Sequence, residues 1–319
     1  ALEAKGPAFA SFIVDHGLGP LWHARTERDE FRESRLAAEA FYLVQDRALT
    51  EIDELLEKSG IDFAVMKGAA NRRLLYDNPA VRACHDIDLL VHAEDRVKVA
   101  TELVDAGFVA LPNAQVIGHE LALSKDALTI DLHWGLLREG RLAMDCAAGM
   151  LRRRRRIDDM WMLGVEDALF MLLVHPAFAK HLASWEMGLH RVADILRWLQ
   201  TQSFDWPILK ARLERNGVLT AAWASLWWVH ILNEPHESEV LEILLPDTSP
   251  GRLRRAWLDR WLRLDLSERM SSAHWPRLVA FSPLLHDTPR DAFRALLGRR
   301  RAHRRRHSDL EAFQGLFSQ

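Results

Sequence analysis

The sequence predicts an α+β fold, in which a small mixed β-sheet flanked by helices precedes an all-helical domain. Short apolar runs, together with a pair of alternating segments joined by a turn, predict the sheet. Strand patterns nearly vanish after about residue 137, where apolar residues recur at helical spacing, and this change predicts the helical domain. We therefore expect an N-terminal helical segment (1–60) packed on the core, an α/β core (61–140) and a helical domain (141–319).

The elements of the first half follow from apolar spacing and from their end signals. A long helical pattern ends at Gly60, and another glycine separates the first strand from the helix that follows it. Alternating segments on both sides of three turn residues (125–127) are typical of a β-hairpin. The expected order is helix 28–58, strand 63–66, helix 68–76, strand 87–91, helix 93–106, strand 107–111 and hairpin arms 120–124 and 128–134.

The remainder of the chain contains seven helical patterns and two arginine-rich runs. We interpret the first run, 152–156, as a solvated helix face. For the second run, 299–307, a solvated face and a surface that binds an acidic peptide or nucleic acid both remain open. The helical patterns cover 165–174, 189–199, 208–213, 219–232, 240–245, 253–264 and 292–297.

The composition limits the class of protein. With 49% hydrophobic and 27% charged residues, the chain resembles a soluble globular protein. Its net charge of -3 excludes the global positive field of a dedicated nucleic-acid-binding protein, so nucleic acid is not an expected partner. Two cysteines, Cys84 and Cys146, give no disulfide framework and fit a reducing compartment. Because no signal peptide and no bilayer-spanning apolar run is visible, we expect a cytoplasmic protein without a membrane partner.

The strand expected at 87–91 begins beside two carboxylates, Asp86 and Asp88. Successive side chains of a strand alternate between its faces, so these two point the same way while Ile87 points into the core. Neighbouring like charges repel, and clustered carboxylates usually share a cation. Oxygen ligands of this kind suit Mg²⁺, which binds one or two carboxylates together with substrate phosphates. The pair therefore predicts magnesium-dependent transfer of a phosphoryl or nucleotidyl group.

Two neighbouring segments supply further groups for such a site. Lys67 and Gly68 lie where the first strand turns into a helix, and the free backbone N–H groups of a helix start bind phosphate. In the second hairpin arm, Asp131 would complete a carboxylate triad from a neighbouring strand, and His133 would point to the same side. The H-E-x-x-H pattern is absent from the sequence, so a zinc site is not expected.

Taken together, these motifs resemble the polymerase-β-type nucleotidyltransferase superfamily. More narrowly, the chain is similar to an uncharacterised bacterial nucleotidyltransferase family found in some peptide natural-product gene clusters, including lasso-peptide clusters. The superfamily usually has Gly-Ser after its first strand, whereas this chain has Gly68-Ala69 and lacks the hydroxyl. The candidates to hold the triphosphate in its place are Lys67, Asn71, Arg72 and Arg82. The resemblance rests on Lys67-Gly68, Arg82, 86–91 and 130–134, with a weaker continuation through 172–175 and 189–195.

The resemblance implies an enzyme whose nucleotidyltransferase core spans 61–140. It would move a nucleoside monophosphate from an NTP, with ATP the first donor expected, to a hydroxyl or phosphate of a small molecule, peptide or protein, and it would release pyrophosphate. The catalytic residues, which would also bind Mg²⁺, are Asp86, Asp88 and Asp131, the last also a general base. The nucleotide would be bound by Lys67, Gly68, Asn71 and Arg82.

Two other functions remain open. Without the serine hydroxyl, the chain would be a catalytically weak or inactive module whose helical half binds a peptide or protein. Alternatively, an antitoxin-like enzyme would nucleotidylate its protein partner and increase the partner's mass by one NMP. Mg²⁺-dependent NTP binding separates the enzymes from the inactive module. A template-directed polymerase is disfavoured by the acidic net charge.

Overall fold

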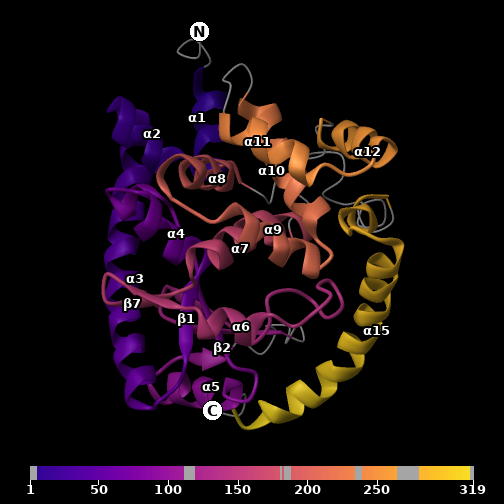
Figure 1. Ribbon diagram of the computed structural model, residues 1–319. Coiled ribbons are helices and arrows are strands. Elements are labelled where there is room, and N and C mark those ends of the chain that lie inside the picture. Colours follow the sequence, from indigo (N-terminus) through magenta and orange to yellow (C-terminus); the bar gives the residue numbers. More distant parts are fainter. Residues whose placement is uncertain are drawn as a thin grey trace.

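The computed structural model describes residues 6–110, 119–179, 182, 188–233, 239–263 and 280–316, with the backbone alone at 6–7 and 299–310. It confirms the α+β class: a mixed sheet with flanking helices is followed by a largely helical region (Figure 1). Within these residues, no helix combines the length and the apolarity needed to cross a bilayer.

The sheet has seven strands in the order β3-β4-β5-β2-β1-β7-β6. β2 pairs with β5 and β1 with β7 in parallel, and the other neighbours are antiparallel. The strands are β1 (Phe63–Met66), β2 (Ile87–Val91), β3 (Val109–Ala110), β4 (Glu120–Lys125), β5 (Leu128–His133), β6 (Arg155–Ile157) and β7 (Met160–Met162).

The helices surround this sheet, and the seven helical patterns expected in the second half all coincide with helices. In Figure 1, α3 runs along one side of the sheet, and α7 to α12 lie above it. The helices are α1 (Gly6–Asp15), α2 (Gly19–Thr26), α3 (Arg32–Lys58), α4 (Lys67–Leu75), α5 (Arg96–Asp105), α6 (Ala147–Arg152), α7 (Val165–Ala179), α8 (His190–Thr201), α9 (Trp206–Arg215), α10 (Leu219–Asn233), α11 (Glu239–Thr248), α12 (Arg252–Leu262) and α15 (Pro289–Ala312), with short 3₁₀ turns η1 (Asp29–Phe31), η2 (Pro79–Val81), η5 (Ser282–Leu285) and η6 (Gln314–Leu316).

The central strands are apolar on both faces because both faces are covered. Alternate residues of β1 divide between two hydrophobic clusters. Ala64 and Met66 join a cluster with α6 to α12, whereas Phe63 and Val65 join one with α3 and α5. The helical region therefore shares a continuous core with the sheet. The division into parts at residues 60 and 140 stays a prediction.

The sheet differs from the sequence expectation at β6 and β7 and at the hairpin loop. The strands β6 and β7 were not expected, because three-residue strands that include arginines have no clear alternation. Pairing of Val65 with Met162 adds them to the sheet, and Asp158 and Asp159, both at positive φ, form their turn. The hairpin loop has two residues instead of three, since Lys125 pairs with Leu128.

The arginine run at 152–156 is largely ion-paired within the fold. Arg153 contacts Asp167 at 2.9 Å and Arg154 contacts Asp62 at 2.6 Å. The structural interpretation of the run is supported by these pairs, but the expected solvated helix face is wrong: α6 ends at Arg152, and Arg155 and Arg156 lie in β6. The second run lies on α15, and its side chains at 299–307 are outside the described residues.

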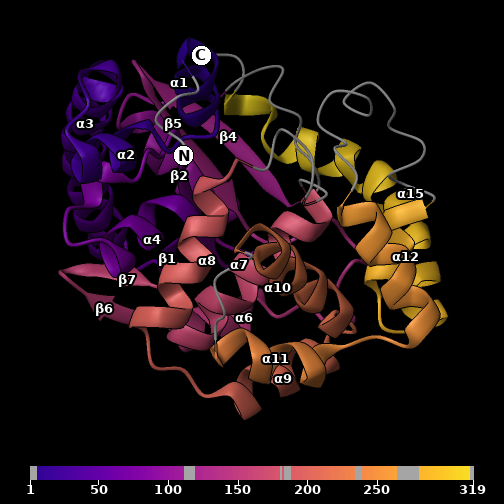
Figure 2. The same ribbon diagram turned by 90° about the horizontal axis from the view of Figure 1, so that it is seen from above.

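Helix α15 returns the chain from the helical region to the sheet (Figure 2). At Gly298 a Cβ atom would lie 2.1 Å from the backbone oxygen of Glu139, so a glycine is required where the helix crosses the segment after β5. Beyond the helix, the buried ring of Phe313 packs on Trp134 with 5.6 Å between ring centroids. The end of the described chain thus stabilises the core beside β5.

A buried ion pair joins the helical region to the segment before β2. The Arg82 guanidinium donates to both carboxylate oxygens of Asp194 on α8, at 2.7 Å from Nη2 and 3.2–3.3 Å from Nε. The Tyr76 hydroxyl donates to the same carboxylate at 2.9 Å. Burial alone would raise the pKa of Asp194, but the Arg82 charge outweighs it and the pKa is lowered.

We predict that Asp194→Ala destabilises the protein by about 3–5 kcal/mol, because it leaves the Arg82 charge buried and unpaired. Tyr76→Phe, which removes one hydrogen bond, should cost about 1 kcal/mol. Urea unfolding at neutral pH measures both. Since the folded-state pKa of Asp194 is lowered, its contribution is present above the ordinary carboxyl pKa and is lost as the pH falls through the lowered value.

The matched control is Arg47→Ala, which breaks the exposed Arg47–Glu51 pair of α3 and should leave stability nearly unchanged. Equal effects of Asp194→Ala and Arg47→Ala would contradict the role of the buried pair.

Candidate functional site

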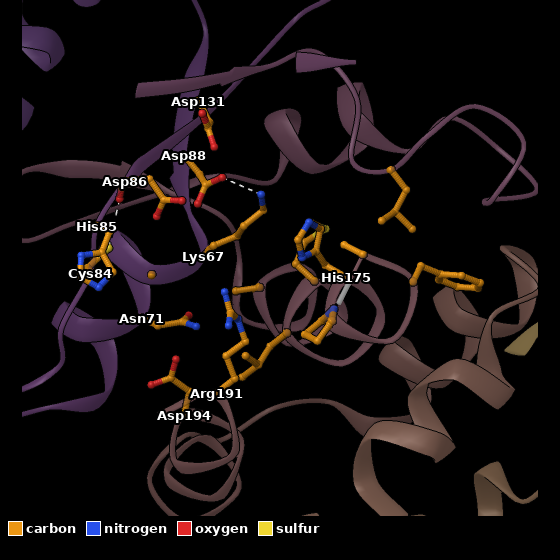
Figure 3. A pocket seen from close by; sticks show the side chains of 18 of the residues that line it. Lys67, Asn71, Cys84, His85, Asp86, Asp88, Asp131, His175, Arg191 and Asp194 are labelled. Atoms are coloured by element: carbon orange, nitrogen blue, oxygen red, sulfur yellow. Dashed lines mark hydrogen bonds and ion pairs between the residues drawn. The ribbon is translucent and has the colours of Figure 1, made fainter. Parts of the chain in front are cut away.

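A cavity of about 410 Å³ lies between the sheet and helices α7 and α8 (Figure 3). Its sheet side carries four carboxylates, which we call the acidic wall: Asp86, Asp88, Glu120 and Asp131. Besides Arg82, three arginines from the segment after β5 and from α8 also line the cavity, and we call them the basic wall: Arg138, Arg141 and Arg191. A ligand that combines a cation with several anionic groups would match both walls.

Strand pairing sets the centre of the acidic wall. Asp88 of β2 lies directly opposite Asp131 of the parallel strand β5. Both side chains therefore emerge on the same face of the sheet, at the same level. Asp88 is only 3% exposed, so its charge depends on partners inside the protein.

Lys67 and His133 are those partners. Lys67 Nζ donates to Asp88 Oδ1 at 2.6 Å, and His133 Nε2 lies 2.8 Å from the same oxygen. Burial alone would raise the pKa of Asp88, but the Lys67 charge and the contact with His133 outweigh it and hold the pKa well below its usual range. Burial alone would likewise lower the pKa of Lys67, and the Asp88 charge raises it instead. Asp88 is thus ionised and Lys67 charged at neutral pH.

Asp131 and Asp86 have raised pKa values, in contrast to Asp88. Burial, followed by the nearby Asp88 charge, raises the pKa of Asp131 to about 6. The same two causes, in the same order, raise the pKa of Asp86. Both carboxylates line the cavity, and within the described residues neither makes a side-chain hydrogen bond. Their raised pKa values indicate negative charge that a bound cation would relieve.

The arrangement fits a divalent cation. Ligand atoms of Asp88, Asp131 and His133 lie within 4.8 Å of one another. Asp86 lines the same cavity but is not part of that close group, because it precedes β2 and is not fixed by the strand ladder. The structure therefore brings two of the three expected carboxylates together with His133 and places the third beside them.

The turn from β1 into α4 positions Lys67. Its backbone has φ of +54°, an uncommon value for a residue with a side chain and one that is often found at functional sites. Gly68 follows, and a Cβ there would lie 2.7 Å from Cys84 Sγ and 2.9 Å from Arg82 Nη1. The glycine thus makes room for the segment before β2. Ala69, at the usual serine position, is fully buried.

Of the other residues expected to bind the nucleotide, Asn71 and Arg82 line the cavity and Arg72 is not among its lining residues. Asn71 projects from α4 into the cavity (Figure 3). Arg82 also lines the cavity, but Asp194 and the Ala83 carbonyl engage its guanidinium. Arg72 donates instead to Gln45 on α3.

Sequence spacing did not identify the helical side of the site. Arg191 of α8 and His175 of α7 both project into the cavity (Figure 3). Burial, then the Lys67 charge, lowers the pKa of His175 well below its usual value, so the ring is neutral. His190 also lines the cavity, and its Nδ1 lies 3.1 Å from the His16 carbonyl oxygen. Their weak family resemblance was the only signal in this part of the chain.

Comparison with known proteins gives one family. The family model described as an uncharacterised nucleotidyltransferase matches residues 8–233, which is more than half of the chain. The crystal structure of an antigenic nucleotidyltransferase-like protein from Paracoccidioides brasiliensis is similar at 17% sequence identity and a TM-score of 0.41, with 61% of this chain and 91% of that chain covered. None of the curated proteins matches.

We predict that Asp88→Asn lowers the pKa of Asp131, because it removes the nearby like charge while burial still keeps the value above the ordinary one. A pH titration of labelled aspartate carboxyls by NMR, on metal-free protein, measures the value, which should start at about 6 in the unaltered chain. Asp105→Asn, on the exposed end of α5, is the control and should leave it unchanged. An unchanged or raised pKa in Asp88→Asn would show that the two carboxylates do not interact.

Proposed function

The chain belongs to the family of uncharacterised nucleotidyltransferases, and on that premise we propose that it is a Mg²⁺-dependent enzyme that transfers a nucleoside monophosphate from an NTP to an acceptor. The observation that carries the proposal is the opposition of Asp88 and Asp131 on parallel strands, at a cavity that arginines also line. Acceptor oxygen and α-phosphorus would form a bond, and the bond from α-phosphorus to the bridging oxygen would break, releasing pyrophosphate.

Asp86, Asp88 and Asp131 would hold the metal, since their oxygens are the ligands that Mg²⁺ prefers. Bound there, Mg²⁺ would supply charge neutralisation to the phosphates. His133 contacts Asp88 through Nε2 and would keep that carboxylate in a fixed orientation. Imidazole is a poor ligand for Mg²⁺, so this orienting role suits His133 better than ligation.

The acceptor hydroxyl would lose its proton to Asp131. Its pKa of about 6 in the ligand-free site leaves this carboxylate mostly ionised at neutral pH, as a base must be. Lys67 would bind the leaving phosphates, together with Arg191 and the backbone at the start of α4. ATP is the first donor to test. The proposed assignment of Asn71, Gly68 and Arg82 to nucleotide binding follows from their place around the same cavity.

The acceptor has a hydroxyl or phosphate group and belongs to a small molecule, a peptide or a protein. We propose to include a modified peptide among the acceptors tested, because the sequence motifs resemble a family found in some lasso-peptide gene clusters. An antitoxin-like enzyme would instead modify a protein partner, and mass spectrometry of a co-expressed partner would then show an added NMP.

A second candidate function is a nucleotide- or peptide-binding module with little activity. The pairing of Lys67 with Asp88 at 2.6 Å favours it, because an internal cation already compensates the central carboxylate. The buried Ala69 at the serine position favours it as well. In such a module, any NTP binding would be independent of Mg²⁺.

We predict that Mg²⁺ and one NTP together raise the melting temperature, and that Asp88→Ala abolishes this shift. Because Asp88→Ala also leaves the Lys67 charge without its partner, the variant should start from a lower melting temperature than the unaltered chain. A ligand that binds only the native state stabilises it by about 2.7 kcal/mol at a hundredfold excess over Kd. The measurement is a thermal-shift titration of ATP, GTP, CTP and UTP, each with and without Mg²⁺. Asp105→Ala, remote from the cavity, is the control and should respond like the unaltered chain.

A shift that does not need Mg²⁺ would favour the binding module. The absence of a shift with every NTP would contradict both the transferase and the nucleotide-binding module. A peptide-binding module would then be the remaining candidate.

A further inference from the structure

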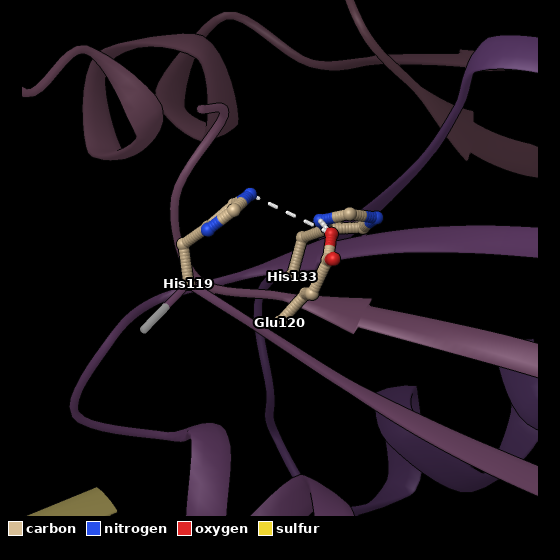
Figure 4. A group of neighbouring side chains, drawn as sticks. All are labelled: His119, Glu120 and His133. Carbon is tan, nitrogen blue, oxygen red and sulfur yellow. Dashed lines mark ion pairs between the residues drawn. The ribbon is translucent and has the colours of Figure 1, made fainter. Parts of the chain in front are cut away.

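A second group of ligand atoms lies beside the acidic wall, at the open end of the β4–β5 hairpin. It consists of His119, Glu120 and His133, which we call the hairpin group (Figure 4). Glu120 Oε2 lies 3.3 Å from His133 Nδ1 and 3.5 Å from His119 Nε2. All three ligand atoms lie within 4.8 Å of one another.

The backbone fixes the members of the hairpin group. Glu120 and His133 are directly opposite each other on antiparallel strands. The Trp134 N–H donates to the His119 carbonyl at 3.0 Å and extends the pairing by one residue. The group is therefore held by the hairpin register and needs no rearrangement of the chain to converge.

The buried ring of His133 has one nitrogen whose hydrogen bonding is not satisfied. The residue is 1% exposed, and Nδ1 has no hydrogen-bond partner although it faces Glu120. On the other side of the ring, Nε2 contacts Asp88 Oδ1 at 2.8 Å and Lys67 Nζ at 3.2 Å. Nδ1 is thus the ring nitrogen left for a ligand, and it is directed at a carboxylate oxygen of Glu120. A cation held between Nδ1 and this oxygen would satisfy both atoms.

A metal-binding histidine usually donates its other ring N–H to a carboxylate, which is the relation of His133 to Asp88. Donor atoms around a tetrahedral Zn²⁺, each about 2.0–2.1 Å from the metal, lie about 3.4 Å apart. The separations of 3.3 Å and 3.5 Å in the hairpin group match this value. Two imidazoles and one carboxylate are ligands that Zn²⁺ prefers and Mg²⁺ does not.

We propose that His119, Glu120 and His133 form a binding site for Zn²⁺ that is separate from the oxygen ligands Asp88 and Asp131. His119 and Glu120 line the cavity, so a fourth position of the ion faces it. The ion would hold the ring of His133, and through it Asp88, in place. Unlike zinc ligands spaced along one helix, these residues are 1 and 13 positions apart and converge by strand pairing.

The test is a titration of the metal-free full-length chain with Zn²⁺, in excess Mg²⁺ so that oxygen ligands are filled. Equilibrium dialysis with elemental analysis gives stoichiometry and affinity, and Co²⁺ in place of Zn²⁺ reports four- or five-coordination by visible absorption. We expect one ion per chain. His119→Ala and Glu120→Gln should each weaken its binding by about a hundredfold or more.

Two controls separate this site from its surroundings. His85→Ala removes an exposed histidine of the same cavity, and Asp131→Asn removes an oxygen ligand of the neighbouring group; both should retain the ion. Circular dichroism establishes that each variant is folded. Absence of binding to the unaltered chain, equal affinity in His119→Ala, or loss in Asp131→Asn alone would each overturn the proposal. These measurements need no transferase activity, so their outcome is independent of the proposed function.

Discussion

The parallel pairing of β2 with β5 is the constraint on which the site depends. Its register sets Asp88 opposite Asp131, at a position where Asp88 is almost completely buried. Two ionised carboxylates so close together and so far from water repel each other. The surrounding groups shift their pKa values in opposite directions. Lys67 and His133 hold Asp88 ionised, whereas Asp131 and Asp86 have raised pKa values. One strand pair thus places a stable anion, Asp88, beside a carboxylate that favours a cation or a proton, Asp131.

The helical region completes this site and is not an independent attachment. It supplies the basic wall through α8 and the segment after β5, and its apolar residues share a cluster with Ala64 and Met66 of β1. The buried pair of Arg82 with Asp194 fixes α8 against the segment that precedes β2. Gly68 lies close to Arg82 and Cys84, so the turn that carries Lys67 adjoins this pair. The cavity and the packing of the helical region therefore share residues.

His133 connects the two groups of ligand atoms. Its Nε2 contacts Asp88 within the acidic wall, and its Nδ1 faces Glu120 in the hairpin group. A cation bound by Nδ1 would hold the ring in place, and with it the contact to Asp88. The residue thus links the proposed zinc site to the carboxylates of the proposed transferase.

The sequence by itself determined the sheet core, the helices of the second half, and Asp86, Asp88, Asp131 and Lys67 as residues around one site. Those inferences depend on short-range periodicity, and the period of two residues on a strand is recorded directly in the order of residues. Only the tertiary structure added β6 and β7 to the sheet, because their pairing depends on the free edge of β1. It alone paired Lys67 with Asp88, and it alone brought Arg191, Asp194 and His119 to these sites. Such contacts join residues far apart in the chain, and no local pattern records which distant side chain will neutralise a buried charge.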